Sequence, residues 1–240
     1  MEKGLFEISE KIKNGKIKRI KLLGDSITHG VGGTGFCQNG EFITEDFARN
    51  KDGFCWAKLF KDYLRDKYGC EVVNNGCTGT NIEYVINNLD KLLDEQDELV
   101  ICMIGTNNRH QYKGALPKKT REEMADAFYS NVLKLNEMIA KKVKDVIFMA
   151  NIPASVQNES DGIDSGGNFY WRILHMNDIN AIYKKAQQKA GFMFISMYDL
   201  LSEYISNFGV KIEDLLGDGL HPNDKGYQIM FELLKKELSI

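Results

Sequence analysis

The sequence lacks long hydrophobic runs and has no excess of basic residues. No segment approaches the roughly 20 consecutive apolar residues that a membrane-spanning helix requires. Residues 1–7 contain early acidic side chains and lack the apolar region of a signal peptide. The formal net charge of −3 gives no bulk attraction to nucleic acid or to an anionic membrane surface. We therefore expect a cytoplasmic protein that neither inserts into membranes nor binds nucleic acid.

Cysteine pairs and histidine clusters are also missing. The cysteines are an odd number without C-x-x-C spacing: Cys37, Cys55, Cys70, Cys77 and Cys102. Such a set favours reduced, mostly buried thiols over a disulfide framework or a zinc site. The sequence contains no H-E-x-x-H segment, so no metal is expected either.

What is present is ordinary globular composition. The 240 residues are 43% apolar and 27% charged, and their number suits one large domain. No low-complexity linker, repeat or change in composition divides the chain, so we predict a single domain over residues 1–240.

Short apolar runs alternate with stretches of helical periodicity. The runs show little polar alternation, which is typical of strands covered on both faces of a parallel sheet. Strands are predicted over residues 17–25, 71–75, 98–105, 145–152 and 191–197. Helices are predicted over residues 55–68, 81–95, 120–143, 171–190 and 224–238. This order predicts a doubly wound α/β sheet. Basic residues from Lys16 to Lys21 indicate that the first strand has a solvated face or lies at a sheet edge.

Two long irregular stretches, residues 30–54 and 153–170, follow predicted strands. Loops of this length are usually functional or mobile, and open α/β sheets bind ligands at the carboxyl ends of their strands. The segment from Gly30 to Gly35 fits the pattern G-x-G-x-x-G. A dinucleotide-binding loop opens a helix directly after its strand, whereas residues 24–29 intervene here and no helical pattern follows. We therefore expect no NAD and no other cofactor.

Three side chains near opposite ends of the chain suit nucleophilic catalysis. Ser26 follows the first predicted strand, and Asp218 stands three residues before His221. A serine hydroxyl becomes a good nucleophile when an imidazole accepts its proton and a carboxylate holds that imidazole. Thr28 occupies the second glycine position of G-x-S-x-G, so the strained elbow of α/β-hydrolases is not indicated. The alternative is that Ser26 caps a turn or a helix.

Four segments in sequence order strengthen the catalytic interpretation. They are residues 24–26 (GDS), 74–79 (NNGCTG), 105–108 (GTNN) and 218–221 (DGLH). Together they resemble the signature blocks of the SGNH (GDSL-like) esterase and lipase family. The resemblance spans nearly the whole chain. It implies a three-layer α/β/α, flavodoxin-like fold with a parallel five-stranded sheet.

The resemblance also implies a role for each residue. Ser26 would be the nucleophile, His221 the general base and Asp218 its orienting partner. The backbone N–H groups of Ser26 and Gly79 and the side-chain amide of Asn107 would form the oxyanion hole. The alternatives are that Gly79 is an ordinary turn glycine and that Asn107 satisfies loop backbone groups.

The sequence departs from the commonest family pattern at two positions. Asn108 stands where an aspartate often follows the block asparagine, and Ile27 replaces leucine after Ser26. Neither change removes a catalytic group, but the first leaves the hydrogen bonding of its loop open.

Several other side chains are candidates for substrate contact. His29 could line the pocket, and His110 follows the third block. Tyr170 and Trp171 end the second long loop, although they could equally begin a helix and pack beneath it. His175 falls within a helical pattern and is interpreted as structural.

These observations predict a serine esterase that hydrolyses carboxylic esters through an acyl-serine intermediate. Polar, glycine-rich loops favour a short acyl group, such as O-acetyl on a carbohydrate, in a small-molecule substrate. A lysophospholipase or an acyl-CoA thioesterase would use the same catalytic residues. A non-catalytic carbohydrate-binding protein is the alternative of a different class.

Overall fold

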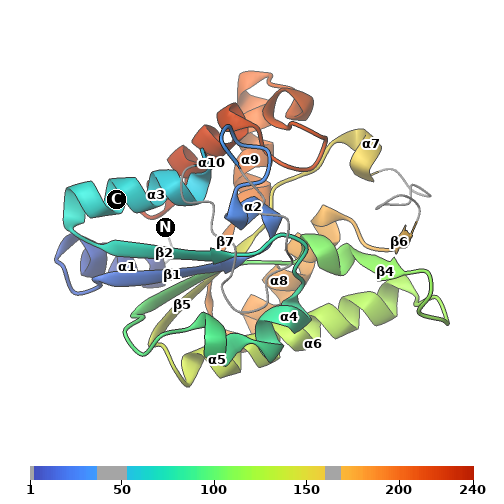
Figure 1. Cartoon of the computed structure of the whole chain (residues 1–240), viewed down its shortest axis with the longest axis horizontal. Coiled ribbons are helices and arrows are strands. Elements are labelled where there is room, and N and C mark those ends of the chain that lie inside the picture. Colours follow the sequence, from blue (N-terminus) through green and yellow to red (C-terminus); the bar gives the residue numbers. More distant parts are fainter. Residues whose placement is uncertain (1–2, 37–52, 160–168) are drawn as a thin grey trace.

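The computed structural model describes residues 3–36, 53–159 and 169–240. Its centre is a parallel five-stranded sheet with the order β2-β1-β3-β5-β7 (Figure 1). The strands are β1 (Arg19–Gly24), β2 (Glu71–Gly76), β3 (Leu99–Met103), β5 (Asp145–Ala150) and β7 (Met193–Ser196). This is the flavodoxin-like strand order, and the predicted fold is confirmed. That residues 1–240 form a single domain stays a prediction.

The side chains of β3 explain why the strands read as apolar runs. Leu99, Ile101 and Met103 belong to one apolar core, whereas Val100 and Cys102 belong to a second. Successive side chains of a strand point to opposite faces of its sheet, and each of these five is fully buried. A central strand between two cores therefore has no polar face to show in its sequence.

Helices cover both faces of the sheet (Figure 1). The first core packs under α1 (Lys3–Lys13), α3 (Trp56–Tyr68), α9 (Met197–Phe208) and α10 (Asp224–Glu237). The second packs under α4 (Ile82–Asn87), α5 (Leu89–Leu92), α6 (Arg121–Ala140) and α8 (Met176–Ala190). None of the helices within the described residues is both long and apolar enough to cross a membrane.

Short elements follow the carboxyl ends of three strands. They are α2 (Ser26–His29) after β1, the 3₁₀ helix η1 (Thr106–Arg109) after β3 and α7 (Val156–Glu159) after β5. A second 3₁₀ helix, η2 (Ile212–Leu215), precedes α10. Polar residues in α2 and η1 are therefore gathered at one end of the sheet, where ligands bind in this class of fold.

Some predicted helices differ from those observed. The stretch 81–95 is divided at Asn88, whose side-chain amide donates to the Tyr84 carbonyl oxygen and competes with the helical pattern. The helix expected over residues 171–190 begins instead at Met176. The sequence patterns did not predict α1 or α9, which complete the first core.

The start of the expected helix at residue 171 is wrong because the chain forms a small second sheet there. Strand β4 (His110–Tyr112) pairs antiparallel with β6 (Tyr170–Arg172). The backbone N–H of Ile173 then donates to the Arg109 carbonyl oxygen at 2.8 Å. This pair of strands is anchored to the end of η1 and extends beyond the central sheet (Figure 1).

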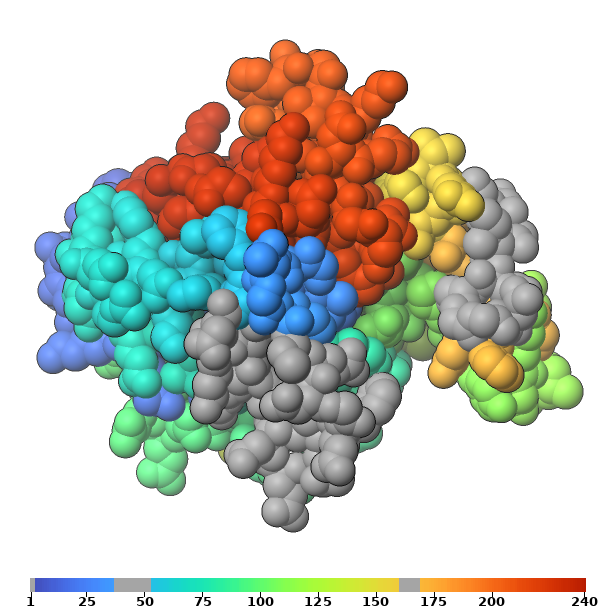
Figure 2. Space-filling model, turned by 45° about the horizontal axis from the view of Figure 1, so that its top comes forward, coloured from blue at the N-terminus to red at the C-terminus, as the bar shows by residue number. Residues whose placement is uncertain are grey.

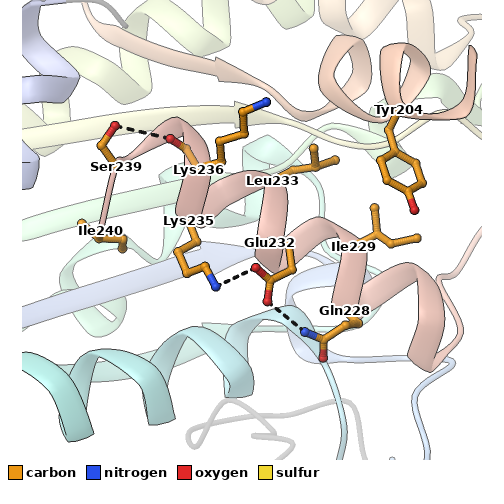
Figure 3. A pocket seen from close by; sticks show the side chains of 9 residues that line it. All are labelled: Tyr204, Gln228, Ile229, Glu232, Leu233, Lys235, Lys236, Ser239 and Ile240. Atoms are coloured by element: carbon orange, nitrogen blue, oxygen red, sulfur yellow. Dashed lines mark hydrogen bonds and ion pairs between the residues drawn. The ribbon is translucent and has the colours of Figure 1, made fainter. Parts of the chain in front are cut away.

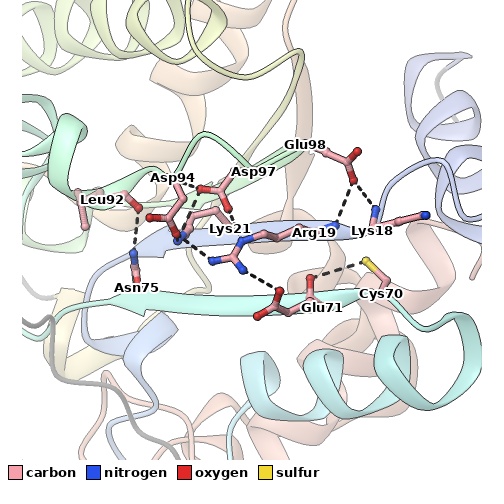
Figure 4. A network of polar contacts seen from close by, with 10 residues as sticks. All are labelled: Lys18, Arg19, Lys21, Cys70, Glu71, Asn75, Leu92, Asp94, Asp97 and Glu98. Carbon is pink, nitrogen blue, oxygen red and sulfur yellow. Dashed lines mark hydrogen bonds and ion pairs between the residues drawn. The ribbon is translucent and has the colours of Figure 1, made fainter.

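The basic residues of β1 do not lie at a sheet edge or on a solvated face. The strand lies between β2 and β3, and Lys21 is 1% exposed. Its Nζ lies 2.7 Å from Asp94 Oδ2 and 3.5 Å from Asp97 Oδ2 (Figure 4). Arg19 contacts the same two carboxylates and Glu71. This network lies near the amino end of β1, away from Ser26, and belongs to the scaffold.

An open groove of about 480 Å³ lies along α10 beside Tyr204 of α9 (Figure 3). Ile229 and Leu233 contribute apolar surface, and the Lys235–Glu232 ion pair lies at its side. None of the residues that line this groove was singled out by the sequence.

Candidate active site

Ser26 occupies the first position of a one-turn helix at the carboxyl end of β1. Asp25 caps this helix, because its Oδ1 accepts a hydrogen bond from the Ile27 N–H at 3.0 Å. The helix ends at Gly30, whose φ of 111° favours glycine. Ser26 is 5% exposed. The strand, the cap and the short helix together hold Ser26 at the ligand-binding end of the sheet.

The fold brings His221 to Ser26 from the far end of the chain. His221 Nε2 lies 2.8 Å from Ser26 Oγ, and His221 Nδ1 lies 2.7 Å from Asp218 Oδ2. If the proton sits on Nδ1, toward the carboxylate, Nε2 is the acceptor for the serine hydroxyl. The fold thus brings together the three side chains that the sequence singled out, and their catalytic roles stay a prediction.

The turn that carries His221 is built around the Asp218 carboxylate. Asp218 Oδ1 accepts hydrogen bonds from the N–H groups of Leu220 at 3.0 Å and His221 at 2.7 Å. Partial burial opposes ionisation of Asp218, but the hydrogen bonds from His221 outweigh it and hold the pKa of this carboxyl well below its usual range. The Gly219 carbonyl oxygen accepts from the Ser155 N–H at 2.9 Å, which ties the turn to the segment before α7.

The glycine run after α2 has a packing role. A Cβ at Gly32 would collide with the Pro222 carbonyl oxygen, and a Cβ at Gly33 would collide with the Phe54 carbonyl oxygen. Gly32 also has a φ of 96°. These glycines let the chain pass directly against the segment that carries His221, which explains the run without a nucleotide.

The two other candidate oxyanion donors lie on loops that contact each other. Asn107 Nδ2 donates to the Thr80 carbonyl oxygen at 2.7 Å, and Thr80 Oγ1 donates to the Gly24 carbonyl oxygen at 3.2 Å. Gly79 directly precedes Thr80 and has a φ of 78°, a conformation that suits glycine. The Ser26 N–H, at a helix start, has no acceptor within its own helix. The loops that carry Gly79 and Asn107 thus meet at the end of β1.

Asn151 is a part of this site that the sequence reasoning missed. Its Nδ2 donates to Asp25 Oδ2 at 3.0 Å and also contacts Thr106 Oγ1. Burial raises the pKa of Asp25, and the bonds from Ile27, Thr106 and Asn151 act in the opposite direction. These contacts fasten the ends of β1, β3 and β5 to one another. The available signal was a polar residue directly after a buried strand, as at Ser26 and Asn107.

Asn108 shows how this chain does without an aspartate at that position. Its Oδ1 accepts from the Ile82 N–H at 2.9 Å, and its Nδ2 donates to Glu83 Oε2 at 2.8 Å. Asn131 donates to the other oxygen of Glu83 at 2.9 Å. The amide of Asn108 therefore caps α4 and binds a carboxylate at once, which an aspartate could not do.

We expect Asn108→Asp to destabilise the protein, because at neutral pH two carboxylates would then face each other. Loss of a hydrogen bond to a charged partner predicts a decrease of about 1–3 kcal/mol in the free energy of unfolding, measured with urea. The double variant N108D/E83Q supplies an amide donor for the new carboxylate and should recover most of the loss. Equal stability of N108D and wild type would contradict this account.

His29 was expected to contact substrate, but the structure buries it. The side chain is 1% exposed, and its Nδ1 lies 2.8 Å from Thr78 Oγ1. Its ring packs edge-on against Phe36. Burial lowers the pKa of His29 to about 4, so the ring is neutral under ordinary conditions. His29 therefore supports the residue next to Gly79 and is not in a position to contact substrate.

This burial predicts a loss of stability in acid. The folded-state pKa of about 4 lies below the ordinary value of 6.5, so between these pH values the unfolded chain binds more protons. Stability should fall as the pH drops from 6.5 towards 4, by at most about 3 kcal/mol from this group. His29→Asn keeps a partner for Thr78 and removes the titration. Urea unfolding at several pH values should show a shallower decline for the variant; identical slopes would contradict the prediction.

The remaining candidates lie on or near the second sheet. His110 and Tyr170 are in β4 and β6, and Trp171 packs with its ring 5.4 Å from Lys118 Nζ. His175 begins α8, and its Nδ1 lies 2.9 Å from Glu159 Oε2, in keeping with a structural role. Figure 2 shows a hollow in the surface beside this second sheet. The blue and red segments that carry the serine and the histidine border one side of it, and the orange and lime strands border the other.

The described residues hold no group of three His, Cys, Asp or Glu side chains placed to bind a metal ion. Within these residues the cysteines are free and buried; Cys37 lies outside the described ranges.

The comparisons with known proteins agree with this geometry. Residues 22–229 match the model of the GDSL-like lipase/acylhydrolase family, which is most of the chain. The chain belongs to this family. As a GDSL-like acylhydrolase it is a carboxylic ester hydrolase. A search among curated proteins gave no match.

Solved structures share the fold of this GDSL-like hydrolase. LAE5, an α/β hydrolase enzyme from the metagenome of Lake Arreo, Spain, is 19% identical, with a TM-score of 0.66 over 92% of this chain and 95% of that one. Axe2, an acetylxylan esterase from Geobacillus stearothermophilus, is also 19% identical, with a TM-score of 0.64 over 93% of this chain and 94% of that one.

Proposed function

We propose that this hydrolase cleaves esters with Ser26 as nucleophile, His221 as general base and Asp218 as the group that orients the histidine. The observation that carries the proposal is the position of His221, whose two ring nitrogens lie 2.8 Å from Ser26 Oγ and 2.7 Å from Asp218 Oδ2. A non-catalytic binding protein has no need of this alignment.

The reaction would proceed in two halves. Ser26 Oγ attacks the ester carbonyl carbon as its proton passes to His221 Nε2, and the carbonyl oxygen becomes an oxyanion. The carbon–oxygen bond to the alcohol then breaks, and the alcohol leaves with the proton held by His221. Water repeats these steps on the acyl-serine, which releases the acid and restores the hydroxyl of Ser26.

Three donors would receive the negative oxygen in both halves. They are the backbone N–H groups of Ser26 and Gly79 and the amide of Asn107. One Asn107 N–H is used by Thr80, and the same bond fixes the amide so that its second N–H can serve the oxyanion. In other hydrolases, removing one such oriented donor lowers kcat by roughly 10²–10³-fold.

We propose a short acyl group, such as acetyl on a carbohydrate, as the group removed. Polar, glycine-rich loops support this, and so does the acetylxylan esterase activity in the printed name of Axe2. A lysophospholipase or an acyl-CoA thioesterase would use the same chemistry with a deeper apolar site.

A chain-length series tests the acyl specificity. We expect kcat/KM for p-nitrophenyl acetate to exceed that for p-nitrophenyl decanoate by at least about tenfold, since a small site excludes the longer chain. Hydrolysis of acetyl-CoA and decanoyl-CoA measures the thioesterase alternative. Faster turnover of the decanoyl esters would overturn the short-acyl proposal, and no turnover of any ester with retained sugar binding would favour the binding protein.

A further inference from the structure

The strands β4 and β6 present four side chains on one face. In their register, His110 lies opposite Arg172 and Tyr112 lies opposite Tyr170. Directly opposed residues of an antiparallel pair have their side chains on the same face, and alternate residues along a strand share a face. We call this set, His110, Tyr112, Tyr170 and Arg172, the ribbon face. Trp171 belongs to the opposite face.

Arg172 is the charged member of the ribbon face, and within the described part of the chain it has few hydrogen-bond partners. Among the described residues its guanidinium makes one hydrogen bond, from Nε to His110 Nε2 at 3.4 Å. Its Nη1 is buried without a partner. A buried charged donor without an acceptor is rare in folded proteins and calls for an explanation such as a bound group.

The carboxylate of Glu159, whose charge acts on Arg172, is already committed to other partners. Glu159 Oε1 lies 2.6 Å from Arg109 Nη1, and Glu159 Oε2 accepts from the Met176 N–H and contacts His175. Arg109 is fully buried, so Glu159 serves as the counter-charge of that arginine. Arg172 is therefore a half-buried positive charge that forms no ion pair with the carboxylates of the described residues.

His110 prepares Arg172 for a ligand without adding charge. Burial, followed by the charges of Arg109 and Arg172, lowers the pKa of His110 to about 3. The ring is thus neutral at ordinary pH, and its Nε2 can accept the bond from Arg172 Nε. This contact fixes one side of the guanidinium, whose terminal nitrogens are those that bind a carboxylate as a fork.

The two tyrosines add an apolar surface next to this charge. Tyr112 is 54% exposed and Tyr170 is 41% exposed, although both are large aromatic residues. Their ring centroids lie 5.8 Å apart with an interplanar angle of 59°, so the rings form an open corner. Aromatic faces of this kind receive the apolar face of a sugar ring, whose C–H groups meet the negative face of the π system.

The ribbon face lies within reach of the reacting centre. Asn107 and His110 are joined through η1, and the rise of about 2 Å per residue in a 3₁₀ helix separates their Cα atoms by about 6 Å. Arg172 is a further roughly 5 Å away, the spacing of opposed residues in an antiparallel pair. These spacings place the Arg172 Cα within about 11 Å of the Cα of Asn107, a candidate oxyanion donor, so a sugar whose ester binds there can extend onto the ribbon face.

We propose that the ribbon face is a subsite for the alcohol part of the substrate, and that this part is a sugar with an anionic group, carboxylate or phosphate, which Arg172 binds. The sugar ring packs against Tyr112 or Tyr170. This inference rests on the proposed esterase function and adds the substrate class to it.

Three acetylated probes test the subsite: mono-O-acetylated methyl glucoside, its glucuronic acid counterpart and its glucose 6-phosphate counterpart. We expect wild type to hydrolyse at least one acidic probe with a kcat/KM at least about tenfold above that for the neutral probe, mainly through KM. Added salt should reduce this preference. The two acidic probes distinguish a carboxylate from a phosphate.

Variants of Arg172 test whether this side chain causes the preference for acidic probes. Arg172→Gln should reduce the ratio of acidic to neutral kcat/KM by about tenfold, and Arg172→Lys should retain part of it. Arg65→Gln is the matched control, because it removes one positive charge from an exposed position on α3. No acidic preference in wild type, or an equal loss on all probes in Arg172→Gln, would overturn the subsite.

The failure of the subsite can be told from failure of the proposed function. p-Nitrophenyl acetate has neither a sugar nor an anionic group, so its hydrolysis reports the chemistry of Ser26 alone. If that hydrolysis does not depend on Ser26, the esterase proposal fails; if it does and the acidic preference is absent, the subsite alone fails.

Discussion

Ser26→Ala should lower kcat for p-nitrophenyl acetate by roughly 10⁴–10⁶-fold, down to whatever the oxyanion donors and substrate binding still provide. The reason is that, among the described residues, no other nucleophile forms a hydrogen bond with the His221 ring. The Ser26 hydroxyl is the partner of His221 Nε2 at 2.8 Å, and its removal leaves the imidazole without a hydroxyl to activate. KM should change much less, since the methylene that is kept fills the same space.

The matched control is Ser202→Ala. Its hydroxyl donates to the Tyr198 carbonyl oxygen within α9 and makes no hydrogen bond to the candidate catalytic residues. Both variants should keep the circular dichroism spectrum of wild type. A second readout is covalent trapping, in which a sulfonyl fluoride should label a peptide containing Ser26 in wild type and in Ser202→Ala but not in Ser26→Ala. Wild-type activity in Ser26→Ala would end the serine-esterase proposal.

Asp218→Asn should lower kcat by about 10²–10⁴-fold while the fold is retained. An asparagine oxygen can still accept from the N–H groups of Leu220 and His221, so the turn should survive. Its NH₂ group would then face His221 Nδ1. That nitrogen would have to become an acceptor, which moves the ring proton to Nε2 and leaves no base for Ser26.

The pH profile and a charge-matched variant together separate this tautomer effect from a general loss of negative charge. The pKa of Asp218 lies well below its usual range, so the carboxylate remains ionised through the mildly acidic region, and the acid limb of the wild-type profile should not arise from it. Asp214→Asn, in η2, is a matched control with the same change of charge and should retain wild-type kcat. If Asp218→Asn keeps more than half of the wild-type kcat, the orienting role of Asp218 is wrong.

The sequence predicted the central sheet well because its signals are local. Four of the strands are short apolar runs that are mostly buried between two layers, whereas the edge strand β2 is partly exposed. Each functional block lies at the end of such a strand or precedes the last helix. The division of the helix at Asn88 was missed, because it depends on which backbone oxygen a polar side chain reaches. The strands β4 and β6 were missed because three residues carry little strand signal until a distant partner lies beside them.

The candidate substrate-binding residues also show that local sequence does not predict contacts between distant segments. His29 and His110 were indistinguishable as polar residues near functional blocks, yet packing buries the first against Thr78 and gives the second a place beside Arg172. Tyr170 and Trp171 are neighbours in the chain, and the pairing of β6 with β4 sends them to opposite faces. Side-chain direction in a strand follows from pairing, so no local pattern could have separated them.

The sequence by itself determined the family chemistry and the order of the strands, because reactive residue types and apolar runs can be recognised wherever the chain later folds. It also pointed to Ser26 as the nucleophile with Asp218 and His221 as its partners, and these roles stay a prediction. The tertiary structure alone decided which side chains share a surface with them. Asn151, Asn108 and Arg172 gain their partners from contacts between distant segments, and such contacts exist only after the sheet has brought the strand ends together.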